Sequence, residues 1–205
     1  MKIKHILITV MMLLLFTGCS GSPNDSETAD TYTPAALDTE TTYCADIDIA
    51  DYGVITIQLD QEAAPVTCAN FVELAESGFY DGLTFHRIIA DFMMQGGDPA
   101  GNGTGGSENN IVGEFSSNGY DNPISHERGV ISMARSQDPN SASSQFFICH
   151  ADSDFLDGEY AAFGKVIKGL DVVDAVCQAA EPTDGNGSID PEAQPVMTSV
   201  KIRVE

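Results

Sequence analysis

The sequence predicts a mainly β protein, folded as a closed antiparallel β-barrel with two helices. Short apolar runs, several with the two-residue alternation of strands, recur along residues 43–204, and turn-forming residues separate them. Only two stretches, which begin near residues 65 and 170, carry apolar residues at helical spacing. Many short strands with two helices far apart in the sequence favour a barrel over other arrangements.

The N-terminus is typical of an export signal. Lysines precede an apolar run over residues 6–16, which is too short to span a bilayer, and Thr17-Gly18-Cys19 closes the run. Small residues before a cysteine resemble a bacterial lipobox and predict lipidation of Cys19. The alternative is an ordinary cleaved signal in which Cys19 has no role. We therefore expect a signal peptide over residues 1–18 and a lipid anchor on the extracytoplasmic side of a bacterial cell membrane.

Residues 19–42 are rich in Ser, Thr, Asp, Glu and Pro, so we expect a disordered acidic tether followed by one domain over residues 43–205. Removal of the signal takes away two of the nine basic residues and none of the 31 acidic ones, which leaves a formal charge of −24. This charge argues against nucleic-acid binding and against electrostatic attraction to an anionic membrane. Membrane attachment would therefore depend on the lipid.

The domain begins with a predicted hairpin. Alternating runs at Ala45–Ile49 and Val54–Leu59 flank the turn Asp51-Tyr52-Gly53. Pro65 suits a first helical position, and Gly78 ends that helix. The later predicted elements are strands at Phe85–Ile89, Gly129–Ala134, Gln145–Cys149, Ala161–Val166 and Val196–Val204, and a helix over Leu170–Cys177. A second apolar run, Phe92–Met94, follows the first of these strands and ends in Gln95.

The stretch Phe85–Asp98 is the candidate functional element. Its alternation places Phe85, Arg87 and Ile89 on one side of a strand and His86 and Ile88 on the other. With Gln95 and the apolar residues 92–94, it displays a cation beside an apolar patch, which can hold an apolar group and act on a polar one. The alternative for Arg87 is a surface cation paired with a carboxylate.

Other motifs predict no site. Gly101, Gly103 and Gly106 match a dinucleotide-binding spacing, but no apolar helix follows them, so we expect a loop. Residues 184–190 space oxygen side chains like the start of a calcium loop, but Pro195 stands where a bidentate Glu is required, which favours a surface turn. The histidines show no ligand spacing. We expect no metal and no cofactor.

Four cysteines follow the predicted tether: Cys44, Cys68, Cys149 and Cys177. An exported protein could pair them in three ways. Three of the four lie in apolar-patterned segments, where a cysteine is usually a small buried side chain, so free thiols are favoured.

Three strings in order, FHRIIADFMMQGGDPAGNGTGG, HERGVISMARSQDPNSASSQFFI and FLDGEYAAFGKV, resemble the cyclophilin family of peptidyl-prolyl isomerases, and its short bacterial form most closely. The resemblance covers residues 43–205. It implies a closed eight-stranded antiparallel barrel capped by two α-helices, and an activity that rotates X–Pro bonds without a nucleophile, metal or cofactor.

The resemblance also implies the site. Catalytic roles fall on Arg87, His86 and Gln95. Substrate contacts fall on Phe92, Met93, Gly103, Ala134, Arg135, Ser136, Gln145, Phe147, Phe155, Leu156 and Tyr160. This chain departs from many relatives at three of these positions: Phe155 stands for a Trp that donates a hydrogen bond, Tyr160 for a histidine, and Arg135 for an Asn.

The leading hypothesis is a monomeric, lipid-anchored prolyl isomerase whose partners are proline-containing peptides and exported proteins during folding. The rival is a chaperone or scaffold that binds proline-containing segments without catalysis. A third hypothesis is a calcium-dependent adhesin built on residues 184–190.

Overall fold

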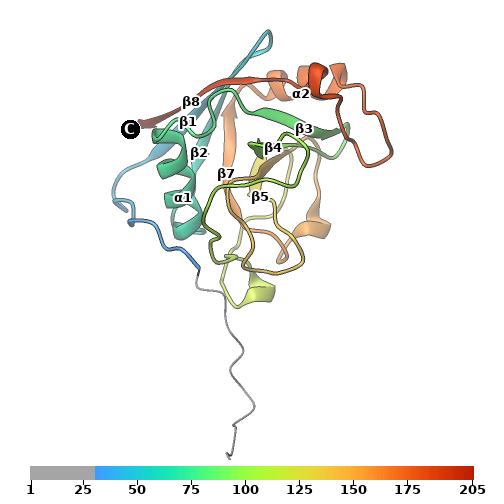
Figure 1. Cartoon of the computed structure of the whole chain (residues 1–205). Coiled ribbons are helices and arrows are strands. Elements are labelled where there is room, and N and C mark those ends of the chain that lie inside the picture. Colours follow the sequence, from blue (N-terminus) through green and yellow to red (C-terminus); the bar gives the residue numbers. More distant parts are fainter. Residues whose placement is uncertain (1–30) are drawn as a thin grey trace, which may run out of the picture.

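The computed structural model describes residues 31–205 (Figure 1), so the predicted signal peptide and the lipidation of Cys19 lie outside the described residues. One sheet of eight antiparallel strands has the order β3-β4-β6-β5-β7-β2-β1-β8. The strands are β1 Tyr43–Ile49, β2 Gly53–Leu59, β3 Thr84–Ile89, β4 Met93–Asp98, β5 Val130–Met133, β6 Phe146–Cys149, β7 Ala162–Lys168 and β8 Met197–Val204. The helices are α1 Pro65–Glu76 and α2 Leu170–Ala179. The predicted strands and helices are therefore all present.

The prediction of a closed barrel is wrong, because the sheet is an open half-barrel with β3 and β8 as its edges. Residues 186–189, between α2 and β8, occupy the edge of β3. The Ile88 N–H donates to the Gly187 carbonyl over 2.8 Å, and the Ile189 N–H donates to the His86 carbonyl over 2.9 Å. Val196, the residue before β8, forms an isolated bridge with Thr84 at the start of β3. The backbone N–H and C=O groups at the edge of β3 thus form hydrogen bonds with a loop instead of with another strand.

The main core lies between the sheet and α1. Alternate residues of β1 and β2 are fully buried, as the two-residue period requires. In α1, Pro65 takes the first helical position, where its missing N–H costs no hydrogen bond. The Phe71 ring of α1 lies 5.1–5.6 Å from three other aromatic rings, those of Tyr80, Phe146 and Phe163. Figure 1 shows α2 apart from α1, over another region of the sheet.

Residues 31–42, which the sequence assigns to the C-terminal end of the predicted tether, lie against the domain. The Tyr32 N–H donates to the Asn110 carbonyl over 2.7 Å, and its hydroxyl contacts both carboxylate oxygens of Glu73 at 2.9 and 2.8 Å. Pro34 is buried. The Gln61 amide donates to the carbonyls of Asp38 and Thr41, each over 2.9 Å. A polar composition predicted disorder, but a few specific contacts hold this segment in place.

The four cysteines of the described chain are free and buried. Among residues 31–205, no three metal-binding side chains cluster. Within the same range, none of the helices has the length and apolar character needed to cross a bilayer.

Candidate active site

A β-bulge at His86 sets the direction of the candidate catalytic side chains. Phe85 pairs with Gly96 and Arg87 pairs with Gln95, so His86 is an extra residue on β3. Phe85 and Ile88 are fully buried in the core, whereas His86 and Arg87 both line a groove. The predicted alternation, with Phe85 and Arg87 on one side, is therefore wrong. The extra residue turns Arg87 from the core side to the groove side.

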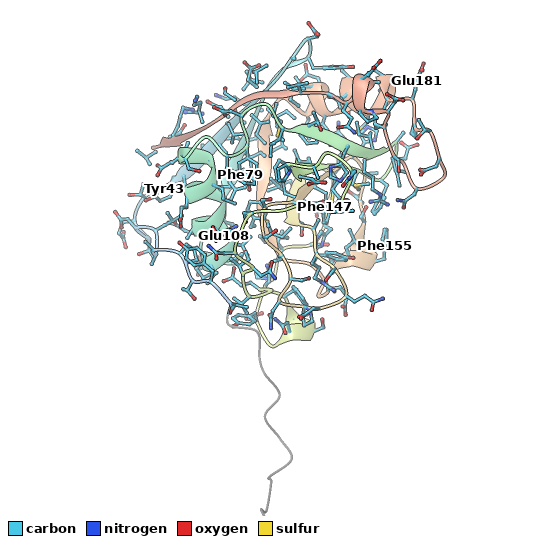
Figure 2. All side chains as sticks on the ribbon, in the orientation of Figure 1. Tyr43, Phe79, Glu108, Phe147, Phe155 and Glu181 are labelled. Atoms are coloured by element: carbon cyan, nitrogen blue, oxygen red, sulfur yellow. The ribbon has the colours of Figure 1, made fainter. Side chains whose placement is uncertain are left out.

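The groove has a volume of about 790 Å³ and is bounded by β3, β4, β6 and several loops. Of the predicted site residues, eleven line it: His86, Arg87, Phe92, Met93, Gln95, Gly103, Ala134, Arg135, Phe147, Leu156 and Tyr160. Ser136 and Gln145 line an adjoining recess of about 330 Å³. Figure 2 shows Phe147 near the middle of the molecule and Phe155 toward the side opposite Tyr43.

Arg87 is half-buried and held only by neutral groups. Its Nε donates to the Asn186 backbone carbonyl over 2.8 Å. Its Nη1 donates to the Gln95 amide oxygen over 3.3 Å and contacts the Met93 sulfur at 3.6 Å. Burial lowers the pKa of Arg87 from its ordinary value, but a guanidinium stays charged near neutral pH. Within residues 31–205, no carboxylate forms an ion pair with Arg87, so its charge is available to a ligand.

Two glutamines connect Arg87 to the glycine-rich loop. Gln95 donates from its amide nitrogen to the Gln145 side-chain oxygen over 2.9 Å. Gln145 in turn donates to the Gly105 carbonyl over 2.7 Å. Each amide orientation is therefore determined by the next acceptor, and the Gln95 oxygen is left facing Arg87. The loop that matched a dinucleotide-binding spacing forms part of the groove wall.

The apolar part of the groove is a small cluster separate from the main core. Met93, Phe147, Cys149 and Leu156 are between 91 and 100 % buried and pack together, with Phe92, Ala134 and Tyr160 against them. A cavity with these walls accepts a compact apolar ring. Phe155 is not part of the lining. Its ring is 68 % exposed and lies 5.5 Å from the Phe92 ring, beside the groove.

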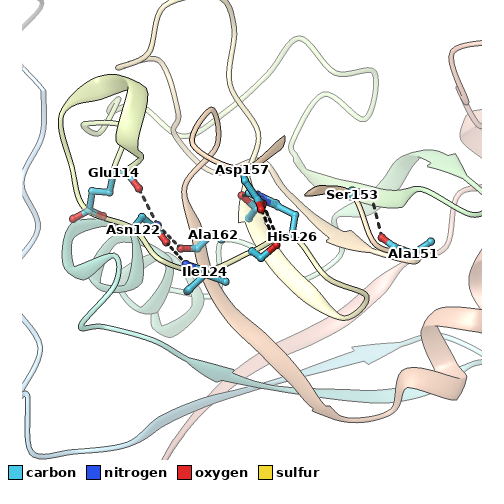
Figure 3. A network of polar contacts seen from close by, with 10 residues as sticks. Glu114, Asn122, Ile124, His126, Ala151, Ser153, Asp157 and Ala162 are labelled. Carbon is cyan, nitrogen blue, oxygen red and sulfur yellow. Dashed lines mark hydrogen bonds and ion pairs between the residues drawn. The ribbon is translucent and has the colours of Figure 1, made fainter. Parts of the chain in front are cut away.

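His126 contacts this cluster through Phe147 and also contacts Asp157, beside which it lies in Figure 3. Its ring stacks on Phe147 at 6.0 Å. Its Nδ1 lies 2.8 Å from the Asp157 carboxylate and its Nε2 lies 3.0 Å from the Ser132 hydroxyl. The order Ser–His–Asp resembles a hydrolytic triad, but Ser132 is 0 % exposed and no peptide can reach it. The contacts instead hold Phe147 and the loop that carries Leu156.

His86 lies beneath Arg87 and is 5 % exposed. Neither of its ring nitrogens has a hydrogen-bond partner in the described chain. Burial lowers the pKa of His86, while the nearby Asp98 acts in the opposite direction. Gly103, with φ of +88°, covers the ring, since a Cβ there would lie 3.6 Å from Nε2. His86 is therefore a buried part of the groove lining, where burial disfavours its charged form.

Residues 183–194 form one wall of the groove, and none of them was predicted from the sequence as a site residue. The lining residues in this segment are Thr183, Asn186, Ser188, Ile189, Asp190, Pro191 and Gln194. The oxygen-rich spacing at 184–190 correctly indicates a turn. It carries no signal that the turn lies against β3, because the partners are about 100 positions apart in the sequence.

Residues 44–203 match the family described as cyclophilin type peptidyl-prolyl cis-trans isomerase/CLD. The chain is 40 % identical to "Peptidyl-prolyl cis-trans isomerase A" of Dickeya dadantii over 204 residues, which is 97 % of each protein. It is 47 % identical to a peptidyl-prolyl cis-trans isomerase of Helicobacter pylori over 128 residues, 62 % of this chain and 76 % of the relative.

Among solved structures, a cyclophilin-type isomerase of Cryptosporidium parvum, crystallised in the presence of the dipeptide Ala-Pro, superposes with a TM-score of 0.69. The two proteins are 31 % identical, and the match covers 78 % of this chain and 98 % of the other. A cyclophilin from Hirschia baltica gives a TM-score of 0.63 at 27 % identity, over 82 % of this chain and 75 % of the other.

Proposed function

The chain belongs to the cyclophilin-type peptidyl-prolyl cis-trans isomerases, and we propose that it rotates X–Pro bonds in exported bacterial proteins, with Arg87 as its catalytic group. One observation carries the assignment of Arg87. Its guanidinium lies at an apolar cluster, is held by a backbone carbonyl and an amide, and has no carboxylate partner in the described chain.

The chemistry requires a cation that interacts more strongly with the twisted bond than with the planar one. Rotation breaks amide resonance against a barrier of roughly 18–20 kcal/mol. At the half-turned geometry the prolyl nitrogen becomes pyramidal and regains a basic lone pair. A guanidinium N–H directed at that nitrogen makes a hydrogen bond that the planar ground state lacks, and only such a difference accelerates the step.

The energy of one hydrogen bond from Arg87 accounts for part of the rate gain, and the apolar pocket must account for the rest. A hydrogen bond to a charged group contributes about 1.5–3 kcal/mol, and each tenfold gain in rate requires about 1.4 kcal/mol. Arg87 would therefore raise the rate of rotation about 10- to 100-fold. Met93, Phe147 and Leu156 would hold the proline ring while the acyl side turns, and Gln95 would orient Arg87. No bond is made or cleaved, so the reaction needs no nucleophile and no proton transfer.

The proposed location rests on the N-terminal sequence, where Cys19 follows an apolar segment. We assign Cys19 as the acylated first residue of the mature chain, which would anchor the protein at the outer face of a membrane. Mass spectrometry of the mature N-terminus tests this assignment. A first residue other than a lipid-modified Cys19 contradicts it, and Cys19→Ser should release the protein from the membrane fraction.

The activity is tested with wild type, Arg87→Lys and Arg87→Ala on a proline-containing tetrapeptide. We expect kcat/KM to fall about 30- to 100-fold for Arg87→Ala, with circular dichroism unchanged. Arg87→Lys should recover little, since an ammonium lacks the planar geometry that Asn186 and Gln95 bind. Full activity of Arg87→Ala would contradict the assignment. Peptide binding without turnover by the wild type would favour the non-catalytic chaperone.

A further inference from the structure

The turn at residues 184–188 has a structural relationship to Arg87 that its sequence does not indicate. Ser188 forms an isolated bridge with Arg87, and backbone hydrogen bonds join Gly187 to Ile88 and Ile189 to His86. The turn therefore adds a short antiparallel pairing to the edge of β3. Its position relative to the groove is determined by the backbone of the strand that carries Arg87.

The turn supplies the Asn186 carbonyl, which accepts a hydrogen bond from Arg87 Nε over 2.8 Å. Because the Nε–H bond lies in the plane of the guanidinium, this hydrogen bond limits rotation of the group. With Nη1 directed at Gln95, the orientation of the charged group is defined from two sides. A neutral carbonyl does this without neutralising the charge, which a carboxylate at the same place would do.

Asp184 holds the turn closed. Its Oδ1 accepts from the backbone N–H groups of Asn186 over 2.9 Å and Ser188 over 3.0 Å. Its Oδ2 accepts from the Ser188 hydroxyl over 2.9 Å. The Gly187 N–H donates to the Asp184 carbonyl over 3.3 Å. Both carboxylate oxygens are therefore engaged in the turn, in the pattern by which Asp side chains stabilise turns.

Gly187 allows the turn to approach β3. Its φ is +87°, a region that residues with a side chain rarely adopt. A Cβ at this position would collide with Cγ1 of Ile89 and lie 2.8 Å from the Ile88 carbonyl. Any larger residue must therefore push the turn away from β3, and the Asn186 carbonyl would move with it.

We propose that Asp184 and Gly187 are positioning residues for catalysis, which act by fixing the carbonyl that orients Arg87. This inference rests on the proposed function of Arg87. Loss of the Asp184 side chain should leave the proline pocket intact, because the buried pocket residues Met93, Phe147, Cys149 and Leu156 do not belong to the turn. The effect of Asp184→Ala should therefore appear mainly in kcat. A side chain at residue 187 would also press on Ile89, which packs against the pocket cluster, so Gly187→Ala can change KM as well.

The test compares Asp184→Ala, Asp184→Asn and Gly187→Ala with wild type, and Glu181→Gln serves as an exposed acidic control just before the turn. We expect kcat to fall about five- to tenfold for Asp184→Ala, and at least as much for Gly187→Ala. Asp184→Asn keeps the Oδ1 acceptor and should stay within about twofold of wild type. In NMR spectra, Asp184→Ala should shift the Arg87 Nε–H resonance and speed its exchange with solvent.

Wild-type kcat in both Asp184→Ala and Gly187→Ala would overturn the inference. An Asp184→Asn variant as impaired as Asp184→Ala would also overturn it, since the charge and not the turn would then matter. Arg87→Ala in the same assay separates the two proposals. If Arg87→Ala is impaired while the turn variants are fully active, only the role of the turn fails. If Arg87→Ala is fully active, the catalytic role of Arg87 fails.

Discussion

The guanidinium carbon of Arg135 lies 4.9 Å from the centre of the Tyr160 ring and 5.0 Å from that of Phe115, so the side chain is sandwiched between two aromatic rings. Its nitrogens donate to the backbone carbonyls of Glu159 and Ser136 at 2.8–3.0 Å. The side chain is only 13 % exposed. The family resemblance places Arg135 along the bound peptide mainly through its backbone, and the structure commits the donors of its side chain to the protein. It joins the two sides of the groove.

Replacement of Arg135 by Lys should therefore widen the groove, because an ammonium cannot stack between two rings and bond two carbonyls together. We expect KM for a tetrapeptide to rise about three- to tenfold, which corresponds to roughly 1 kcal/mol of lost cation–π and hydrogen-bond energy, with kcat nearly unchanged. Steady-state kinetics checks this. The matched control is Arg203→Lys on β8, which should keep wild-type kinetics. A fall in kcat alone would contradict the role given to Arg135.

The chain of hydrogen bonds from Arg87 through Gln95 to Gln145 predicts that substitutions of the two glutamines have coupled effects on kcat. Gln95→Ala and Gln145→Ala should each reduce kcat several-fold, because each removes a group that orients the guanidinium. The double variant should lose less than the product of the two single losses, since the pair acts through one chain of hydrogen bonds. A double-mutant cycle on kcat measures this coupling. Strictly multiplicative losses would show that the two glutamines act independently.

The family resemblance implies that the Trp which Phe155 replaces donates a hydrogen bond to cyclosporin-type inhibitors. Phe155→Trp should therefore strengthen binding of such an inhibitor about two- to tenfold, because the indole N–H adds one hydrogen-bond donor beside the groove. Stability should change by less than about 0.5 kcal/mol, since the ring is 68 % exposed. The chain contains no other Trp, so quenching of the new fluorophore reports binding directly. Affinity for wild type, measured by calorimetry, provides the comparison. Equal affinities would contradict the prediction.

Acidification should destabilise the protein in two stages. Burial lowers the pKa of His86 and His126 below the unfolded value of about 6.5, so the unfolded chain binds more protons and stability falls as pH decreases below that value. Hydrogen bonds lower the pKa of Asp46 and Asp184, so a second loss follows below about pH 4. Urea unfolding between pH 4.5 and 8 checks the first stage. The free energy of unfolding should vary less steeply with pH in His126→Gln than in wild type. An unchanged pH dependence would exclude a contribution from His126.

Buried thiols should be unreactive in the folded protein. Burial raises the pKa of Cys149 and Cys177 to about 12, so almost no thiolate forms at pH 8. Alkylation followed by peptide mass spectrometry should find Cys44, Cys68, Cys149 and Cys177 unmodified before unfolding and fully modified after it, without a reducing agent. A disulfide-linked peptide pair from any two of them would contradict the free state.

Local sequence signals predicted most of this architecture because the forces behind them are local. Alternation in β1 and β2 follows from the strand period, and Pro65 and Gly78 bound α1 through their backbone preferences. The predicted pocket residues Met93, Phe147 and Leu156 do meet in one cluster. They were found through the family resemblance, since an apolar residue in a pocket and one in a core look alike in a single sequence.

By itself, the sequence determined the order of strands and helices, the acidic charge, and the family with its candidate arginine. Only the tertiary structure decided that the sheet stays open, that the His86 bulge turns Arg87 toward the groove, and that a turn about 100 residues away orients its guanidinium. The physical reason is the same in each case. Backbone hydrogen bonds between distant segments depend on no side-chain period, so they leave no pattern in the sequence.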